Sequence, residues 1–188
     1  ASYVGVEGCK SLFKLMQANN TLTRLNISDN FIEDESCVYL ADGLRENTSI
    51  VDIDLSKNKI GPSGCKLLAN MLRTNTTLMW LHLASNSIGS QGCDDLSQAL
   101  CVNSALTYLD VRCNYIQDGG GQSLCEMLKV NSTLTYANLR KNFITNSGCA
   151  ALSELLRVNS TLTSVDLFEC SISDQDFKRL FDALHGNS

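Results

Sequence analysis

The stretch SIVDIDLSKNKIGPSGCKLLANMLRTNT, residues 49–76, decides the fold of this chain. Its first part places Ile50, Ile53 and Leu55 at the spacing of a short strand with one buried face. Asn58 follows the strand, and a buried amide at such a place must be satisfied by the backbone of the turn. The first part therefore predicts a strand followed by a turn that an asparagine side chain holds together.

The second part of the same stretch predicts a helix. Pro62 suits a first helical turn, and Leu68 and Leu72 lie four residues apart, so they share one helix face. Asn75 stands where the helix should stop, and we expect it to close the helix in the left-handed conformation that asparagine tolerates. One strand, one turn and one helix thus make a unit of 28 residues.

The unit recurs without insertion or deletion along the whole chain. With Ser49 at position 1, complete copies occupy residues 21–48, 49–76, 77–104, 105–132, 133–160 and 161–188, and residues 1–20 supply the last part of another copy. Position 10 is Asn in every complete copy except the last, where it is Cys170. Position 20 is always Leu, and position 27 is always Asn. A fixed period of this length predicts a solenoid in which stacked copies share one core.

This pattern resembles leucine-rich repeats of the ribonuclease-inhibitor-like class over the full length of the chain. The resemblance implies an α/β fold, a right-handed solenoid forming a horseshoe fragment, with a parallel sheet on the concave side and helices on the convex side. We expect one domain over residues 1–188, with six strands and seven helices. Cys170 at position 10 is a replacement known in that class.

Composition excludes several classes of function. The chain has 15 basic and 20 acidic residues, a net charge of −5, so it lacks the basic surface that nucleic acids require. It contains no apolar run long enough for a membrane span. Residues 1–20 begin in the middle of a copy without a terminal cap, so we expect an excised piece of a longer protein. The uncapped N-terminal end would also allow the chain to associate with a second copy of itself.

The nine cysteines predict buried thiols rather than a disulfide framework. Five of them occupy position 17 on the inner side of successive helices: Cys9, Cys37, Cys65, Cys93 and Cys149. Packed helix axes lie about 8–10 Å apart, whereas the Cα atoms of a disulfide lie within about 7 Å. We expect these five to be reduced and buried, Cys125 to point inward, and Cys101 and Cys113 to be reachable. Because thiols stay reduced in the cytosol, we expect a cytosolic protein. A ciliary or axonemal location is the second expectation.

A search for catalytic groups finds no convincing set. The two histidines stand on different repeats, and Asp52 and Asp54 lack an acid–base partner or a cluster of metal ligands. The run Asp118-Gly119-Gly120-Gly121 lacks the lysine and hydroxyl residue of a phosphate-binding loop. The sequence contains no C-x-x-C pair, which is the usual signal of a zinc site. We therefore expect a protein that is not an enzyme and that uses neither a cofactor nor a metal ion.

The concave face of the predicted sheet offers a better candidate site. Positions 4, 6 and 8 should point outward from the sheet, and three adjacent strands carry Trp80, Tyr108 and Tyr136 at position 4. Aromatic residues and arginine dominate binding hot spots. The alternative is that aromatic side chains simply cover a flat sheet. The complete set of candidate partner-binding residues is Trp80, His82, Tyr108, Arg112, Tyr136, Arg140 and Phe168.

We therefore expect a protein-interaction or scaffold module that binds a protein partner on its concave face. Arrays of unbroken 28-residue copies resemble those of NOD-like receptors and of the leucine-rich subunits of the axonemal dynein regulatory complex. The segment RCNYIQDGGGQSL, residues 112–124, is similar to the latter. Ribonuclease inhibitor alternates copies of 28 and 29 residues, which argues against a ribonuclease partner. The alternative function is a GTPase-activating regulator resembling Ran GTPase-activating protein.

Overall fold

The computed structural model describes residues 4–170 and 172–185. For four of these residues it describes the backbone but not the side chain: Asn146, Phe177, Leu184 and His185. The statements below about what the structure contains refer to these residues and atoms.

Six short strands alternate with seven helices. The strands are β1 (Arg24–Asn26), β2 (Asp52–Asp54), β3 (Trp80–His82), β4 (Tyr108–Asp110), β5 (Tyr136–Asn138) and β6 (Ser164–Asp166). The helices are α1 (Val6–Ala18), α2 (Cys37–Glu46), α3 (Pro62–Leu72), α4 (Gly89–Leu100), α5 (Gln117–Val130), α6 (Asn146–Val158) and α7 (Asp174–His185). A short 3₁₀ helix, η1 (Asp34–Ser36), precedes α2.

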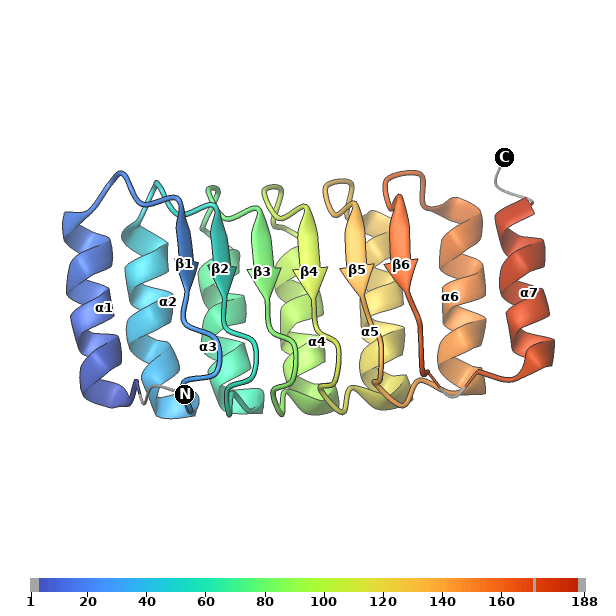
Figure 1. Ribbon diagram of the computed structural model, residues 1–188. Helices are drawn as coiled ribbons and strands as arrows, with labels where there is room; N and C mark the ends of the chain where they lie inside the picture. The colour runs from blue at the N-terminus through green and yellow to red at the C-terminus, as the bar shows by residue number, and fades with distance from the viewer. Residues whose placement is uncertain (1–3, 171, 186–188) are drawn as a thin grey trace.

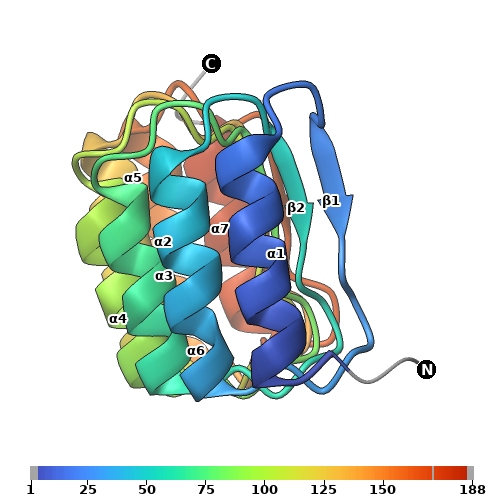
Figure 2. The same ribbon diagram turned by 90° about the vertical axis from the view of Figure 1, so that its left-hand side faces the viewer.

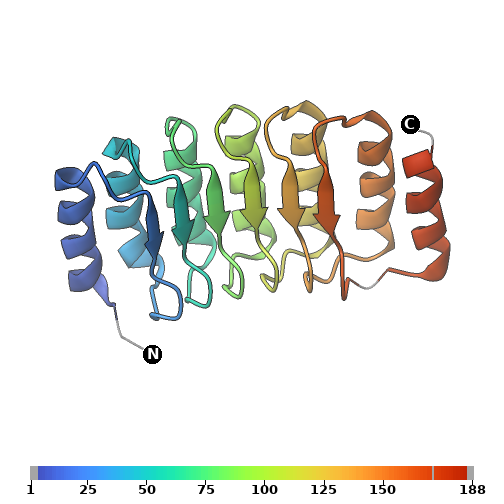
Figure 3. The same ribbon diagram turned by 45° about the horizontal axis from the view of Figure 1, so that its top comes forward.

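All six strands form one parallel sheet in the order in which they occur along the chain. Equivalent positions pair directly, as Trp80 pairs with Tyr108 and Tyr108 with Tyr136. The sheet forms one layer and the helices a second layer behind it, as the end-on view shows (Figure 2). Successive helices are spaced more widely than successive strands, so the sheet lies on the inner, concave side (Figures 1 and 3). The open solenoid expected from the sequence is confirmed.

The core lies between the two layers and runs from repeat to repeat. In the fourth copy Leu106, Leu109 and Val111 of the strand segment meet Leu124 and Leu128 of α5, and each is at most 1% exposed. Their equivalents in the neighbouring copies continue the cluster. No helix in the described part of the chain is long and apolar enough to cross a bilayer. Burial of the same few positions in each copy explains why the period tolerates no insertion.

The position-10 asparagines connect adjacent repeats through hydrogen bonds to the backbone. Asn114 is fully buried, and its Nδ2 donates to the carbonyl oxygens of Leu83, Val111 and Arg112 at 2.8–3.1 Å. Its Oδ1 accepts from the amide of Ile88 at 3.3 Å. The expected structural role of these residues is confirmed.

The position-27 asparagines have a role that differs from the expected one. Asn47, Asn131 and Asn159 have extended backbones with φ of −78°, −74° and −81°, so the left-handed helix end predicted for this position is wrong. Helix α3 ends at Leu72, ahead of Asn75. The amide is what the fold needs, because Nδ2 of Asn75 donates to the preceding repeat while Oδ1 accepts two amides of the next strand segment.

Left-handed backbone instead occurs in the turns that follow the strands. Position 9 has positive φ in every complete copy: Asp29, Lys57, Ser85, Cys113, Lys141 and Glu169. This conformation lets the amide of Cys113 donate to Arg140 of the next copy, and that of Lys57 to Ala84. We call the row of turns at positions 9 to 12 the loop edge. In Figure 1 these turns come after the tips of the strand arrows.

The cysteines lie where the period predicts. The five at position 17 are at most 1% exposed, Cys125 is buried, Cys113 is half-buried and Cys101 is exposed. All nine thiols are free. Burial raises the pKa of Cys37 to about 12 and that of Cys149 to about 11.

We expect thiol reagents to separate these cysteines by rate. A raised pKa leaves less of the reactive thiolate, and burial excludes the reagent. Cys101 should therefore react within the dead time of mixing at mildly alkaline pH, whereas Cys37 and Cys65 should react only as fast as the protein opens. Mass spectrometry of pulse-labelled native protein measures this order. Equal labelling of Cys37 and Cys101 in the native state would contradict the packing.

Candidate functional site

The sheet register brings the predicted aromatic residues onto three neighbouring strands. Trp80, Tyr108 and Tyr136 occupy the first position of β3, β4 and β5 and are paired directly across the sheet. All three are half-buried, so each ring keeps an exposed side. The concave face therefore carries a row of aromatic side chains that belong to no apolar core.

Two rings of this row form a stacked pair. Tyr108 and Tyr136 lie parallel, with an interplanar angle of 0° and ring centroids 4.6 Å apart. On the other side of Tyr108 the neighbouring ring is that of His82, at 4.8 Å and tilted by 41°. Burial, followed by the charge of Asp110, raises the pKa of Tyr108 to about 12. Its phenol is thus a neutral hydrogen-bond donor at physiological pH.

The polar residues beneath the rings are less accessible than the sequence suggests. Asp110 and Asn138, expected to face outward at position 6, are 2% and 3% exposed, and Ala84 at position 8 is also buried. Asp110 and Asn138 accept the amides of Arg112 and Arg140, both at 3.1 Å, so they fold back onto their own turns. Burial at these three residues limits what a partner can reach at positions 6 and 8, although Asp110 still lies on the concave face beside Arg112.

Two arginines stand beside the aromatic row at position 8 of adjacent repeats. The Arg112 side chain is 47% exposed, and its guanidinium lies 3.5 Å from the buried carboxylate of Asp110. Burial raises the pKa of Asp110, against the lowering effect of Arg112. Arg112 thus both neutralises a buried carboxyl group and presents donors to solvent.

Arg140 is part of a surface cluster with an aromatic ring and an acid. Its guanidinium carbon lies 4.2 Å from the centre of the Phe168 ring, which is 57% exposed. Glu169 accepts from Arg140 at 3.3 Å and lies 2.9 Å from Lys141. The hydrogen bond from Lys141 lowers the pKa of Glu169. A carboxylate is therefore already held beside Arg140.

The opposite end of the concave face is polar. Asp52 lies 3.3 Å from both Arg24 and His82. Asn26 donates to Asp54 at 3.3 Å. These side chains line a hollow of about 220 Å³. The candidate site thus changes from polar and acidic at β1–β2 to aromatic and cationic at β4–β5.

The features that could suggest catalysis have structural explanations. Asp118 of the glycine-rich run accepts the amide of Thr145 at 2.6 Å and that of Gly148 at 3.3 Å, so it caps the start of the next helix. Among the described residues, no three His, Cys, Asp or Glu side chains gather closely enough to hold a metal ion.

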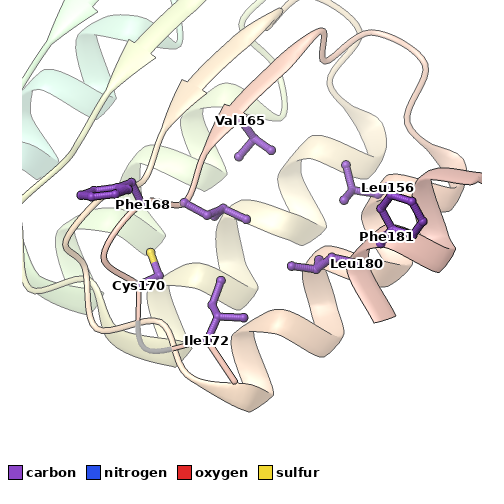
Figure 4. A pocket seen from close by; sticks show the side chains of 8 residues that line it. Leu156, Val165, Phe168, Cys170, Ile172, Leu180 and Phe181 are labelled. Atoms are coloured by element: carbon purple, nitrogen blue, oxygen red, sulfur yellow. The ribbon is translucent and has the colours of Figure 1, made fainter. Parts of the chain in front are cut away.

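An apolar hollow lies between β6 and α7. It has a volume of about 480 Å³, and Figure 4 shows side chains such as Val165, Ile172 and Leu180 around it. These residues occupy positions 5, 12 and 20, which in the inner copies form the buried core. The hollow therefore continues the core of the stack, and its lining side chains are apolar apart from the thiol of Cys170.

A second aromatic pair, which the sequence analysis did not identify, lies at the loop edge. Tyr115 and Phe143 occupy position 11 of adjacent repeats and are 57% and 56% exposed. Their rings stack at 6.1 Å with an interplanar angle of 17°. Aromatic residues at the same position of consecutive copies were the available signal, but nothing in the repeat pattern indicates whether that position faces solvent.

Comparisons with known proteins agree with this architecture. A family model described as Leucine Rich repeat matches residues 18–41, 46–69, 74–97, 102–125, 130–153 and 158–178. No curated protein matches the sequence.

Several solved structures share the fold. Leiomodin-1 Actin-Binding Site 2 has 20% identity and a TM-score of 0.64, over 95% of this chain and 87% of that one. The tropomodulin C-terminal domain of Caenorhabditis elegans has 15% identity and a TM-score of 0.62, over 97% and 92%. An internalin of Listeria monocytogenes has 24% identity and a TM-score of 0.57, over 95% of this chain and 49% of the internalin. At these identities the likeness shows the fold alone.

Proposed function

The chain belongs to the leucine-rich repeat family, and from that premise we propose that it is a non-enzymatic protein-interaction module that binds a protein partner on its concave face. The observation that carries the proposal is the stacked pair of Tyr108 and Tyr136, flanked by Arg112 and Arg140. Repeat solenoids use extended concave surfaces of this kind to hold other proteins. The proposed binding set is Trp80, His82, Tyr108, Arg112, Tyr136, Arg140 and Phe168.

The physical argument rests on preorganisation. A stacked tyrosine pair is already held in one geometry, so binding costs little side-chain entropy. The rings present apolar surface with a polar rim, which suits an interface that must remain soluble when free. The half-buried state of Tyr108 and Tyr136 means that a partner has only to cover the remaining exposed side of each ring.

The comparisons support a protein partner rather than a small molecule. One structure of the same fold, the leiomodin-1 fragment, is named for an actin-binding site. The aromatic row extends over three neighbouring strands, whereas the sites of small ligands are usually concave and largely closed. We place the module in the cytosol, because its buried thiols are free.

Photo-crosslinking tests the proposal and identifies the partner. A photoreactive phenylalanine analogue at Tyr136 should form a protein adduct in a cell extract, and excess unlabelled chain should suppress it. The same analogue at Lys66, an exposed residue on α3, serves as the control on the convex side. Equal adducts at both positions, or an adduct at Lys66 alone, would contradict a concave binding site.

A further inference from the structure

The loop edge beside β4 and β5 carries two exposed aromatic side chains on left-handed backbone. Tyr115 and Phe143 have φ of 58° and 55° and expose more than half of each side chain. For a bulky residue this left-handed conformation is a genuine outlier, and it costs on the order of 1 kcal/mol or more. Exposing aromatic surface to water is also unfavourable. Phe31 has the same backbone conformation and is 44% exposed, so the feature that distinguishes this part of the loop edge is the stacking of two exposed rings on adjacent repeats.

The pair also lies directly after the aromatic row of the proposed concave site. Each of the two adjacent repeats carries, in order, a tyrosine at position 4, an arginine at position 8 and an aromatic ring at position 11. In extended backbone the step from position 4 to position 8 covers four residues, or about 13 Å. Along these two repeats the arginines therefore follow one ring pair and precede the other. The ring centroids are 4.6 Å apart in the first pair and 6.1 Å apart in the second.

The charges between the ring pairs indicate the partner's chemistry. Arg112 and Arg140 stand at equivalent positions of neighbouring repeats, two residues beyond β4 and β5, and like charges at such cross-strand positions are destabilising. Lys141 adds a third cation, and its side chain is 44% exposed. The carboxylate of Glu169 already lies against Arg140 and Lys141, at 3.3 Å and 2.9 Å. With Asp110 against Arg112 as well, three cations face two carboxylates, and a carboxylate from a partner would offset the one positive charge in excess.

We propose that the concave site continues over the loop edge, and that the Arg112–Arg140 and Tyr115–Phe143 pairs bind an extended acidic segment of the partner with apolar side chains at its ends. One apolar end covers Tyr108 and Tyr136, the acidic middle pairs with the guanidinium groups, and the other end covers Tyr115 and Phe143. This inference rests on the proposed function and names the class of segment that the site takes.

A displayed library of random seven-residue peptides is the probe that tests the inference. Selection on the parent chain should enrich peptides with Asp or Glu in the middle and aromatic, aliphatic or proline residues at the ends. Replacing the acidic residues of an enriched peptide by Asn or Gln should weaken its binding roughly tenfold. High salt should weaken the binding of the acidic peptide in the same direction.

The deciding variant is Tyr115→Asn with Phe143→Asn. Asparagine tolerates positive φ better than an aromatic residue, so this variant should melt at the same temperature as the parent or higher. It should nevertheless bind the enriched peptide roughly tenfold more weakly. Phe31→Asn is the matched control, because Phe31 also occupies position 11, with φ of 57°, but lies beside β1. The control should bind the peptide like the parent.

The outcomes separate this inference from the proposed function. Enriched peptides that lack acidic residues, or that bind the double variant as tightly as the parent, overturn the loop-edge inference. If such peptides still lose binding on Tyr108→Ala, the concave site stands without the loop edge. A selection that enriches no peptide also overturns the inference, because no short segment is then recognised, while the crosslinking test decides the concave site independently.

Discussion

Replacing Asn142 by alanine should lower the free energy of unfolding by about 3 kcal/mol or more, because it leaves several buried backbone groups without partners. Asn142 is fully buried, and its Nδ2 donates to the carbonyl oxygens of Val111 at 2.9 Å and Leu139 at 3.0 Å. Its Oδ1 accepts the amide of Asn114 at 2.8 Å. The variant should unfold at a much lower urea concentration, as measured by circular dichroism.

Asn30→Ala is the matched control, since Asn30 has the same residue type and the same position in its repeat. Within the described part of the chain, its Oδ1 is buried without a hydrogen-bond partner, and its Nδ2 donates to Ser28 at 2.7 Å. Its replacement should cost about 1 kcal/mol. Equal losses at Asn30 and Asn142 would show that the amides do not stabilise the stack by connecting repeats.

The repeat period was sufficient to predict the fold from the sequence. Leu109 and Leu124 occupy their positions because a fixed unit must bury the same faces in every copy, and both are indeed buried. The same logic predicted the burial of Cys65 and the role of Asn58, which donates to the backbone of two repeats. A strict period leaves the packing few alternatives.

The details of the candidate site depended on interactions that the period does not determine. Strand register follows from equivalent positions, so the alignment of Tyr108 and Tyr136 was predictable. The burial of Asp110 was not, because its carboxylate turns back to accept the Arg112 amide. The exposure of Tyr115 depends on a left-handed backbone that sequence propensities disfavour for tyrosine. Side-chain contacts within the turns, not periodicity, decided these features.

Replacing Tyr136 by alanine should weaken partner binding by about 2 kcal/mol or more, the effect expected at a hot spot. The change removes one ring of the stacked pair and leaves Tyr108 without its neighbour at 4.6 Å. Both the apolar contact and the preorganisation of the site are lost. Titration calorimetry with the crosslinked partner, once purified, measures the change in dissociation constant.

The same titration with Tyr39→Ala tests the central claim, that the concave face binds the partner, most directly. Tyr39 is also a half-buried tyrosine, but it lies on α2 in the convex layer. Circular dichroism should first show that both variants remain folded. The account predicts roughly thirtyfold weaker binding for Tyr136→Ala and parent-like binding for Tyr39→Ala. Parent-like binding by Tyr136→Ala together with a large loss for Tyr39→Ala would contradict it and assign the partner to the helical face.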